Sequence, residues 1–270
     1  MTQRDALYRQ IILEPIYVCA TYKPKMGQGR GKGYELEAFQ SLYRADPFYN
    51  WFGLDNPLMY AAHKAAGGMT SVYRQIGIGC ERLFRQILID ELKLSAIEAN
   101  WSYEKQTAGG KTQTLYLDGR IPTAAVKDPK RQEAVKDWIE RAAAELGVAQ
   151  SVRNTLTGVI FEVRQGYKSK DSKRQNADIA NAATAYVNTY LPCVSVFSNQ
   201  IDGDIQTRYR TEKWAMLTGT VGTTNDLRSL YAFMKQVIAY DLAAFFERNT
   251  SILRIEIDRV LRALLEVDKI

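Results

Sequence analysis

Apolar positions recur along the chain at helical spacing in several long segments. Segment 70–95 shows this best, with apolar side chains at Leu83, Phe84, Ile87, Leu88 and Leu92. Residues three and four apart share one face of a helix, so this segment is expected to bury that face. Similar reasoning predicts helices over 1–20, 35–66, 127–148 and 171–190, and a mostly helical chain from about residue 211.

Alternating or continuously apolar runs predict strands in the middle of the chain. They cover 99–105 and 111–121, joined through Gly109-Gly110 as a hairpin, and then 157–167 and 192–198. Strands that alternate with helices in this order indicate an α/β fold, with a mixed central β-sheet flanked by helices and helical N- and C-terminal parts. We expect a helical region with a basic, glycine-rich loop at 1–69, a central core at 70–220 and C-terminal helices at 221–270.

Composition narrows the class of protein only a little. The 270 residues are 46% hydrophobic, which is enough for a sizeable core, and 36 basic against 30 acidic residues give a net charge of +6. This mild excess fits a polyanionic partner such as nucleic acid, although many ordinary enzymes share it. The N-terminus lacks a signal-peptide layout and no apolar run approaches the roughly 18 residues of a membrane span. We therefore expect a cytoplasmic protein with no membrane partner.

The cysteines and the single histidine limit the chemistry. Cys19, Cys80 and Cys193 are far apart and set in apolar surroundings, so they are expected to be reduced core residues. His63 is the one histidine, which excludes metal sites built from several imidazoles. Its helical context favours a structural role over a catalytic one.

An acid and a base stand two residues apart on the predicted strand 157–167. Glu162 and Arg164 leave the same face of that strand, whereas Phe161 and Val163 point the other way. They could form a simple ion pair, or they could hold a divalent cation and a phosphate. Asp118, at the end of another strand of the same predicted sheet, favours the second interpretation, because two carboxylates from neighbouring strands suit Mg²⁺.

A strand aspartate followed by E-V-R on a later strand and then by a helix resembles the core of the PD-(D/E)xK nuclease superfamily, in particular type II restriction endonucleases. The resemblance covers roughly 70–220 and implies that Asp118 and Glu162 are metal ligands. It also implies a ligand role for Glu81, in the preceding helix. Arg164 stands where the family usually has lysine. Either Arg164 acts electrostatically, or Lys168 on the same face supplies the ammonium group.

A run of polar and basic residues follows this strand at the start of a predicted helix. Basic residues there oppose the helix dipole, so DNA phosphates are a plausible reason for their presence. Arginine, glutamine and asparagine also form paired hydrogen bonds with guanine and adenine. The candidate DNA contacts in this run are Lys170, Lys173, Arg174, Gln175 and Asn176, with further candidates at Arg208, Arg210, Lys25, Arg30 and Lys32. A solvated basic surface is the alternative for each of them.

These expectations combine into a Mg²⁺-dependent, sequence-specific endonuclease that cuts double-stranded DNA. A palindromic site would require a two-fold symmetric protein, so a homodimer is expected, with the C-terminal helices as candidate interface. The alternatives are a non-cleaving DNA-binding protein derived from a nuclease fold, an RNA or repair nuclease on the same core, and a helical scaffold with an ordinary ion pair at 162 and 164.

Overall fold

The computed structural model describes most of the chain as two compact units. The residues outside the description are 1, 26–32, 107–111, 167–180 and 266–270. One unit comprises Met1–Gly79 with Arg248–Ile270, and the other comprises Cys80–Glu247. Two long helices, α4 (Pro57–Leu92) and α11 (Leu242–Leu265), contribute residues to both units.

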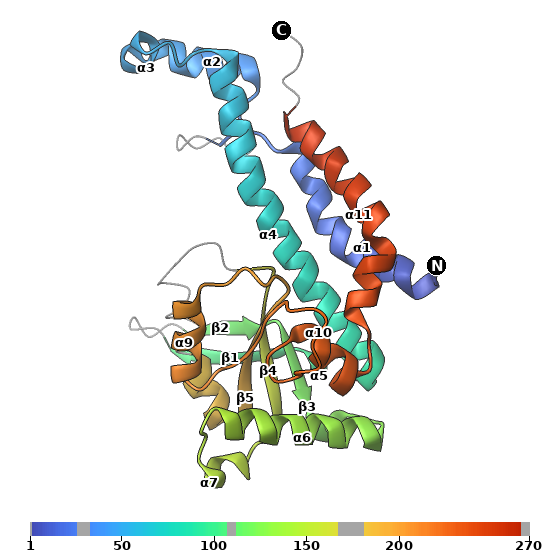
Figure 1. The fold of residues 1–270 in the computed structure, drawn as a ribbon. Helices are drawn as coiled ribbons and strands as arrows, with labels where there is room; N and C mark the ends of the chain where they lie inside the picture. Colours follow the sequence, from blue (N-terminus) through green and yellow to red (C-terminus); the bar gives the residue numbers. More distant parts are fainter. Residues whose placement is uncertain (1, 26–32, 107–111, 167–180, 266–270) are drawn as a thin grey trace. The chain divides into compact units, whose positions relative to one another are not determined.

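The first unit is helical. It contains α1 (Gln3–Tyr17), the 3-10 turn Val18–Thr21, α2 (Leu36–Ala45), α3 (Pro47–Trp51) and parts of α4 and α11 (Figure 1). We predicted a break between helices 35–66 and 70–95, near Gly67 and Gly68, but α4 runs through both glycines. A side chain at Gly67 would collide with Tyr22, and one at Gly68 would collide with Leu264. The glycines are needed for close packing, so they do not end the helix.

The second unit contains a mixed sheet, as the sequence predicted. Its strands, in spatial order, are β3 (Gly119–Pro122), β4 (Gly158–Arg164), β5 (Tyr190–Val196) and β6 (Ala215–Leu217). Strands β3 and β4 are antiparallel, while β4, β5 and β6 are parallel. The predicted hairpin is also present, as β1 (Trp101–Gln106) and β2 (Thr112–Leu117), but it forms a sheet of its own. The predicted strand 111–121 therefore divides at Asp118, where the chain leaves one sheet and enters the other.

Aromatic side chains cover one face of the four-stranded sheet. Phe161 of β4 lies 4.9 Å from the ring of Phe84 on α4 and 5.8 Å from Phe233 on α10 (Leu230–Phe233). Phe233 in turn lies 4.7 Å from Trp138 on α6 (Pro129–Glu145). All five apolar residues that predicted the helical face of segment 70–95 are fully buried. The core is therefore built on the helices and the strand that the pattern indicated.

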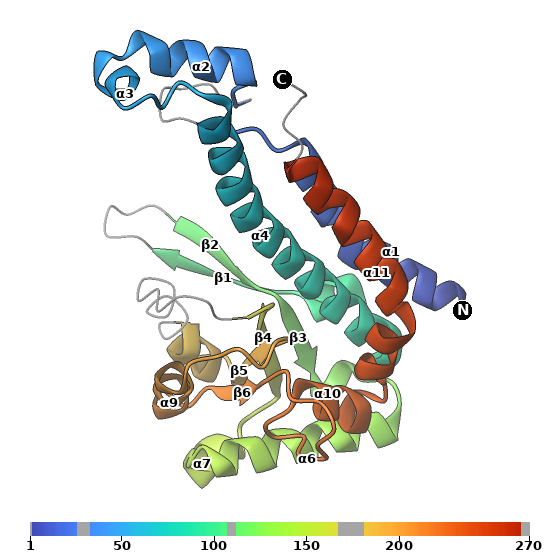
Figure 2. The ribbon, with the colours of Figure 1, turned by 45° about the horizontal axis from the view of Figure 1, so that its top comes forward.

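The opposite face is covered by different elements. Ile160 of β4 packs with Trp101 and Leu117 of the β1–β2 hairpin and with Ala185 of the helical residues 181–187. Farther along the sheet, α9 (Gly203–Thr211) packs its buried residues against β5 and β6. Figures 1 and 2 show α6 and α9 on either side of the strands. Glu162 and Arg164 belong to this second face, since they share the side of β4 that carries Ile160.

The prediction for the C-terminal third was wrong in two places. Strand β6 and a long loop after it interrupt what we expected to be mostly helix. The helical part also breaks: α10 continues as a π-helical turn, Met234–Ile238, and Ala239 then takes a left-handed φ of 69°. The next helix begins at Leu242, where the Asp241 carboxylate accepts the Ala244 amide at 3.0 Å. This helix then runs without a break to Leu265.

Candidate active site

Asp118 occupies the bend between β2 and β3 and is bonded to β4 on both sides of Glu162. Its amide donates to the Phe161 carbonyl at 2.9 Å, and its Oδ2 accepts the Val163 amide at 2.8 Å. The register of β3 and β4 begins with Gly119 opposite Phe161, and Asp118 directly precedes it. The structure thus ties Asp118 to the β4 backbone on either side of Glu162.

Glu162 and Arg164 form an ion pair between the Glu162 Oε1 and the Arg164 Nη1. Both residues are buried, with 7% and 8% of their surface exposed. The strand β4 that carries them is buried along its whole length. Buried charges strengthen one another electrostatically, and they are costly unless each is partnered. The Glu162–Arg164 pair therefore lies in a low-dielectric environment, on the strand whose backbone Asp118 contacts.

Arg85 of α4 is a contact of Asp118 that the sequence did not reveal. Its Nε donates to the main-chain carbonyl of Asp118 at 2.8 Å. Glu81 lies four residues before Arg85 on α4, and residues four apart on a helix are neighbours. Its half-buried side chain thus belongs to the helix that holds the Asp118 bend. Arg85 could not have been found from spacing, because its partner is a backbone atom.

Asp118 and Glu162 are the acidic residues of this candidate site. Across the residues that the structure describes, no group of three or more His, Cys, Asp or Glu side chains is close enough to hold a metal ion. The chemistry of the donor set still suits one hard cation, because Mg²⁺ is usually bound by one or two carboxylates and completes its shell with water and phosphate oxygens. The Asp118–Glu162 pair fits that requirement.

Several candidate residues fall outside the description. Lys168, Lys170, Lys173, Arg174, Gln175 and Asn176 lie in 167–180, and Arg30 and Lys32 lie in 26–32. Lys25 is described and exposed, at the end of the segment that precedes residue 26. The DNA contacts predicted for the residues outside the description remain predictions.

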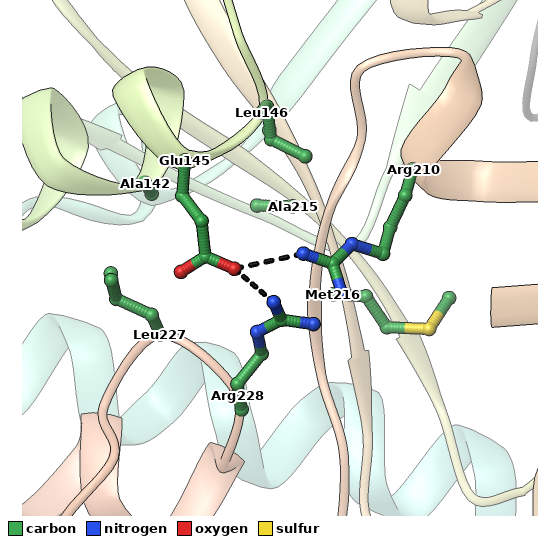
Figure 3. Close-up of a pocket in the computed structure, with 8 residues that line it drawn as sticks. All are labelled: Ala142, Glu145, Leu146, Arg210, Ala215, Met216, Leu227 and Arg228. Atoms are coloured by element: carbon green, nitrogen blue, oxygen red, sulfur yellow. Dashed lines mark hydrogen bonds and ion pairs between the residues drawn. The ribbon is translucent and has the colours of Figure 1, made fainter. Parts of the chain in front are cut away.

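Arg210 lies at the edge strand β6, away from the acidic pair. Its Nη2 bonds to Glu145 Oε1 at 2.8 Å, and Arg228 reaches the same carboxylate oxygen. Figure 3 shows the two guanidiniums converging on Glu145 beside Ala215 and Met216. This contact joins α6 on one face of the sheet to α9 on the other. Arg208 lies on the same helix, one turn before the C-terminal residue.

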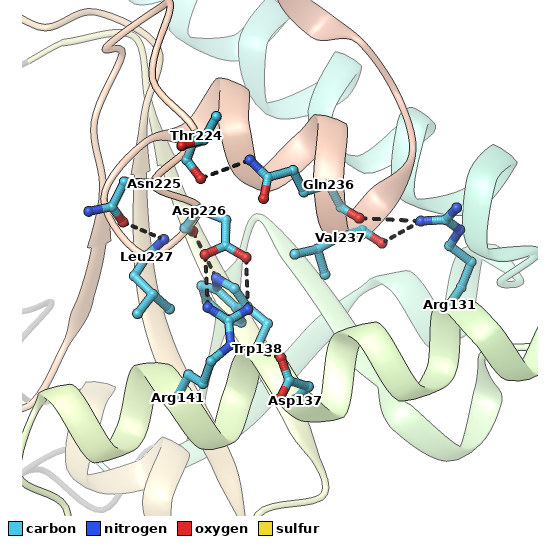
Figure 4. Close-up of polar contacts among 10 residues, drawn as sticks. All are labelled: Arg131, Asp137, Trp138, Arg141, Thr224, Asn225, Asp226, Leu227, Gln236 and Val237. Carbon is cyan, nitrogen blue, oxygen red and sulfur yellow. Dashed lines mark hydrogen bonds and ion pairs between the residues drawn. The ribbon is translucent and has the colours of Figure 1, made fainter.

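A second polar cluster joins α6 to the loop after β6. Arg141 donates to both Asp226 carboxylate oxygens, at 2.9 and 2.8 Å, and Trp138 Nε1 donates to the Asp226 carbonyl at 2.8 Å (Figure 4). The Asp226 carboxylate raises the pKa of Arg141 above its already high ordinary value, so the guanidinium stays charged. This cluster is a structural clamp without a group poised for proton transfer.

The cysteines and the histidine occupy the structural positions that we expected. All three cysteines are buried and none is in a disulfide. Burial raises the pKa of the Cys80 and Cys193 thiols, which keeps both protonated and unreactive. His63 packs among aromatic rings and its Nε2 lies 3.3 Å from the Tyr43 hydroxyl. No described helix has the length and apolar character that crossing a bilayer requires.

Comparison with protein-family models, with curated proteins and with solved structures finds no significant match for this chain. The resemblance to PD-(D/E)xK nucleases therefore stays a prediction from the sequence.

Proposed function

We propose that the protein is a Mg²⁺-dependent, sequence-specific endonuclease that hydrolyses double-stranded DNA in the manner of a type II restriction enzyme. The observation that supports the proposal is the 2.8 Å bond from the Val163 amide to Asp118 Oδ2, which ties Asp118 to the strand residue that follows Glu162. Asp118 and Glu162 come from distant parts of the sequence, and Glu162 is paired with Arg164.

The chain's own residues would divide the work as follows. Asp118 and Glu162 would hold the Mg²⁺ ion, which in hydrolases of this kind polarises the phosphodiester and lowers the pKa of bound water. Arg164, a bidentate donor that stays charged, would stabilise negative charge on the scissile phosphate. Arg85 would keep the Asp118 bend in place through its bond to the carbonyl.

One observation favours a second function, that of a non-cleaving DNA-binding protein with a nuclease ancestry. Glu162 is ion-paired to Arg164, and arginine replaces the lysine that the related enzymes use. Arginine hardly releases a proton, so it cannot serve as a general base or acid. In this case the acidic pair would be a structural remnant and the DNA contacts would persist without cleavage.

A plasmid digest with matched variants separates the two functions. We expect the full chain to cut plasmid DNA into discrete fragments when Mg²⁺ is present, and Glu162→Gln and Asp118→Asn to lose at least about a hundredfold of that rate, as is usual when a single electrostatic catalytic group is removed. Both variants should retain salt-sensitive DNA binding in a gel-shift assay, because they keep every basic residue. Glutamine and asparagine preserve the shape of the side chains and limit the risk of unfolding.

Glu104→Gln is the control, since Glu104 is an exposed carboxylate on β1. It should cut at the wild-type rate. Intact plasmid together with a normal gel shift for the wild-type chain would favour the non-cleaving function. A Glu162→Gln variant that cuts as fast as the wild type would overturn the site assignment.

A further inference from the structure

The short helix α3 of the first unit exposes large aromatic side chains to solvent. Phe48, Trp51 and Phe52, which we call the aromatic patch, are 58%, 79% and 67% exposed. The rings of Phe48 and Phe52 lie 5.2 Å apart, one helical turn from each other, and Trp51 is three residues from Phe48. The three side chains therefore share one side of α3. Leu58, near the start of α4, is also 79% exposed.

The segment that carries the patch is firmly built. Asp46 caps α3 by accepting the Phe48 amide at 2.9 Å, and Asn56 accepts the Met59 amide at 2.9 Å at the start of α4. Arg44 bonds to Asp55 at 3.2 Å across the turn. Ordering a segment costs roughly 1–2 kcal/mol per residue, and that cost is not offset here by burial of the patch. A rigid, exposed apolar surface of this kind marks a contact with another molecule.

The packing beneath the patch holds it in place. Tyr43 of α2 stacks on Tyr49 of α3 at 5.0 Å and on Phe39 at 4.4 Å. Phe39, Tyr43 and Tyr60 are buried in one hydrophobic cluster of α2 and α4. The inner side of α3 is thus already anchored, and its outer side is the one that remains exposed.

The described charges around the patch nearly balance. Residues 22–25 and 33–60, which the structure describes around the patch, contain three basic and four acidic residues. Two of the bases are already paired, Lys23 with Glu35 and Arg44 with Asp55. The candidate DNA contacts Lys25, Arg30 and Lys32 belong to another segment of the sequence and are not part of the patch. The patch itself consists of uncharged aromatic residues, so it is complementary to its own copy, which a two-fold axis brings face to face.

The size of the patch fits the centre of a dimer interface. Aromatic side chains bury about 150–250 Å² each, so three of them at these exposures present roughly 400 Å². A standard interface covers about 800 Å² on each partner, with an apolar, aromatic-rich centre and a polar rim. We propose that the aromatic patch is the centre of a homodimer interface, and that its occupant is the patch of a second copy of this chain.

Sedimentation velocity of the full chain over a wide range of concentrations tests this interface, without DNA or metal. We expect a monomer–dimer equilibrium in the wild type, and a dissociation constant weakened by about thirtyfold or more in Trp51→Ser, the loss typical of a central interface residue. The double variant Trp51→Ser with Phe52→Ser should be monomeric. Ile97→Ser is the matched control, because Ile97 is an 82% exposed apolar residue on α5 (Ala96–Ala99) of the other unit. It should dimerise as the wild type does.

Tryptophan emission gives an independent measure of the same contact. Trp101, Trp138 and Trp214 are buried, so Trp51 is the tryptophan whose surroundings change when the patch is covered. Dilution of the wild type should shift the emission to the red, with a midpoint at the dissociation constant from sedimentation. The shift should vanish in Trp51→Ser.

Three results would overturn the proposal. They are a wild type that stays monomeric at every concentration, a dimer that survives both substitutions, and a dimer that Ile97→Ser disrupts equally. Binding of the monomer to uncharged lipid vesicles that is lost in Trp51→Ser would assign the patch to a membrane surface and equally reject the dimer. None of these outcomes bears on DNA cleavage, so the interface and the nuclease proposal fail independently.

Discussion

The buried pair of Glu162 and Arg164 shows how much a strand pattern can reveal at the level of single residues. Alternation along the strand placed both side chains on one face, and the structure confirms their pairing. The proximity of Asp118 was also predictable, because it ends a strand of the same region. The bond from Arg85 to the Asp118 carbonyl was not, since a helix residue that binds a main-chain atom leaves no spacing signal.

Asp5 gives a residue-scale prediction of pH dependence in the first unit. Its carboxylate is buried and receives bonds from Arg248 Nη2 at 3.1 Å and Nε at 3.3 Å. The hydrogen bond from Arg248 holds the pKa of Asp5 below its ordinary value of 3.8. A carboxylate with a lowered folded-state pKa stabilises the fold at pH above the unfolded value, and that stability is lost as the pH falls from about 3.8 through the lower folded value.

We expect Asp5→Asn to lower the free energy of unfolding by about 1 kcal/mol at neutral pH, a modest value because Arg248 is half exposed. The loss should shrink as the pH falls below 3.8, where the wild-type carboxylate also becomes protonated. Urea titrations at a series of pH values measure this, with the exposed Glu37→Gln as control. A deficit that is the same at every pH would contradict the role of the Asp5 charge.

At the scale of elements, the long amphipathic segments were the most predictable parts. Segment 70–95 buried the face that its pattern indicated, and the helix predicted over 127–148 is present as α6, followed by Gly147 with a φ of 66°. The short strand β6 was missed because three residues carry no periodicity. The break at Ala239 was missed because the apolar spacing continues across it. Gly67 and Gly68 led us to predict a break in α4. They are instead needed for close packing against Tyr22 and Leu264, which are distant in the sequence.

The clamp between α6 and the loop after β6 gives a prediction at this scale. Asp226 is nearly buried and binds Arg141 through both oxygens, whereas Asp137 binds the same arginine on the exposed surface of α6. We expect Asp226→Asn to lower the free energy of unfolding by about 1.5–3 kcal/mol, the range for hydrogen bonds to charged groups. Amide hydrogen exchange should accelerate over 219–229.

Asp137→Asn is the matched control for the clamp, because an exposed pair of this kind contributes about 0.3–0.5 kcal/mol. It should leave the exchange of the loop unchanged. Equal effects of the two substitutions would mean that the loop is held by its backbone bonds, such as the one from Thr218 to the Arg228 carbonyl, and that the clamp adds nothing.

At the scale of the whole molecule, the order of the predicted elements was enough to predict the fold class. A hairpin followed by alternating helices and strands gave a mixed sheet flanked by helices, and the structure has one. The pattern did not predict which strands pair. Strands β1 and β2 form a separate sheet, and the chain passes from that sheet to the four-stranded one at Asp118. This switch is what positions Asp118 against the β4 backbone on either side of Glu162, so the candidate site depends on topology as well as on residue identity.

The net charge of +6 is also a property of the whole molecule. It favours the approach of DNA to the molecule as a whole, while the uncharged aromatic patch is suited to a protein contact. A dimer formed through the patches would supply the two-fold symmetry that a palindromic DNA site requires. The nuclease proposal and the interface are thus compatible, and each has its own test.

The central claim is that Asp118 and Glu162 share one hard divalent cation. Titration of the full chain with Mn²⁺, followed by electron paramagnetic resonance, measures this without relying on cleavage, because Mn²⁺ prefers the same oxygen ligands as Mg²⁺. The account predicts one bound ion in the wild type and in Glu104→Gln, and affinity lowered at least about tenfold in both Asp118→Asn and Glu162→Gln, as expected when a carboxylate ligand is removed. Equal Mn²⁺ binding by all four proteins, or no binding by the wild type, would contradict it.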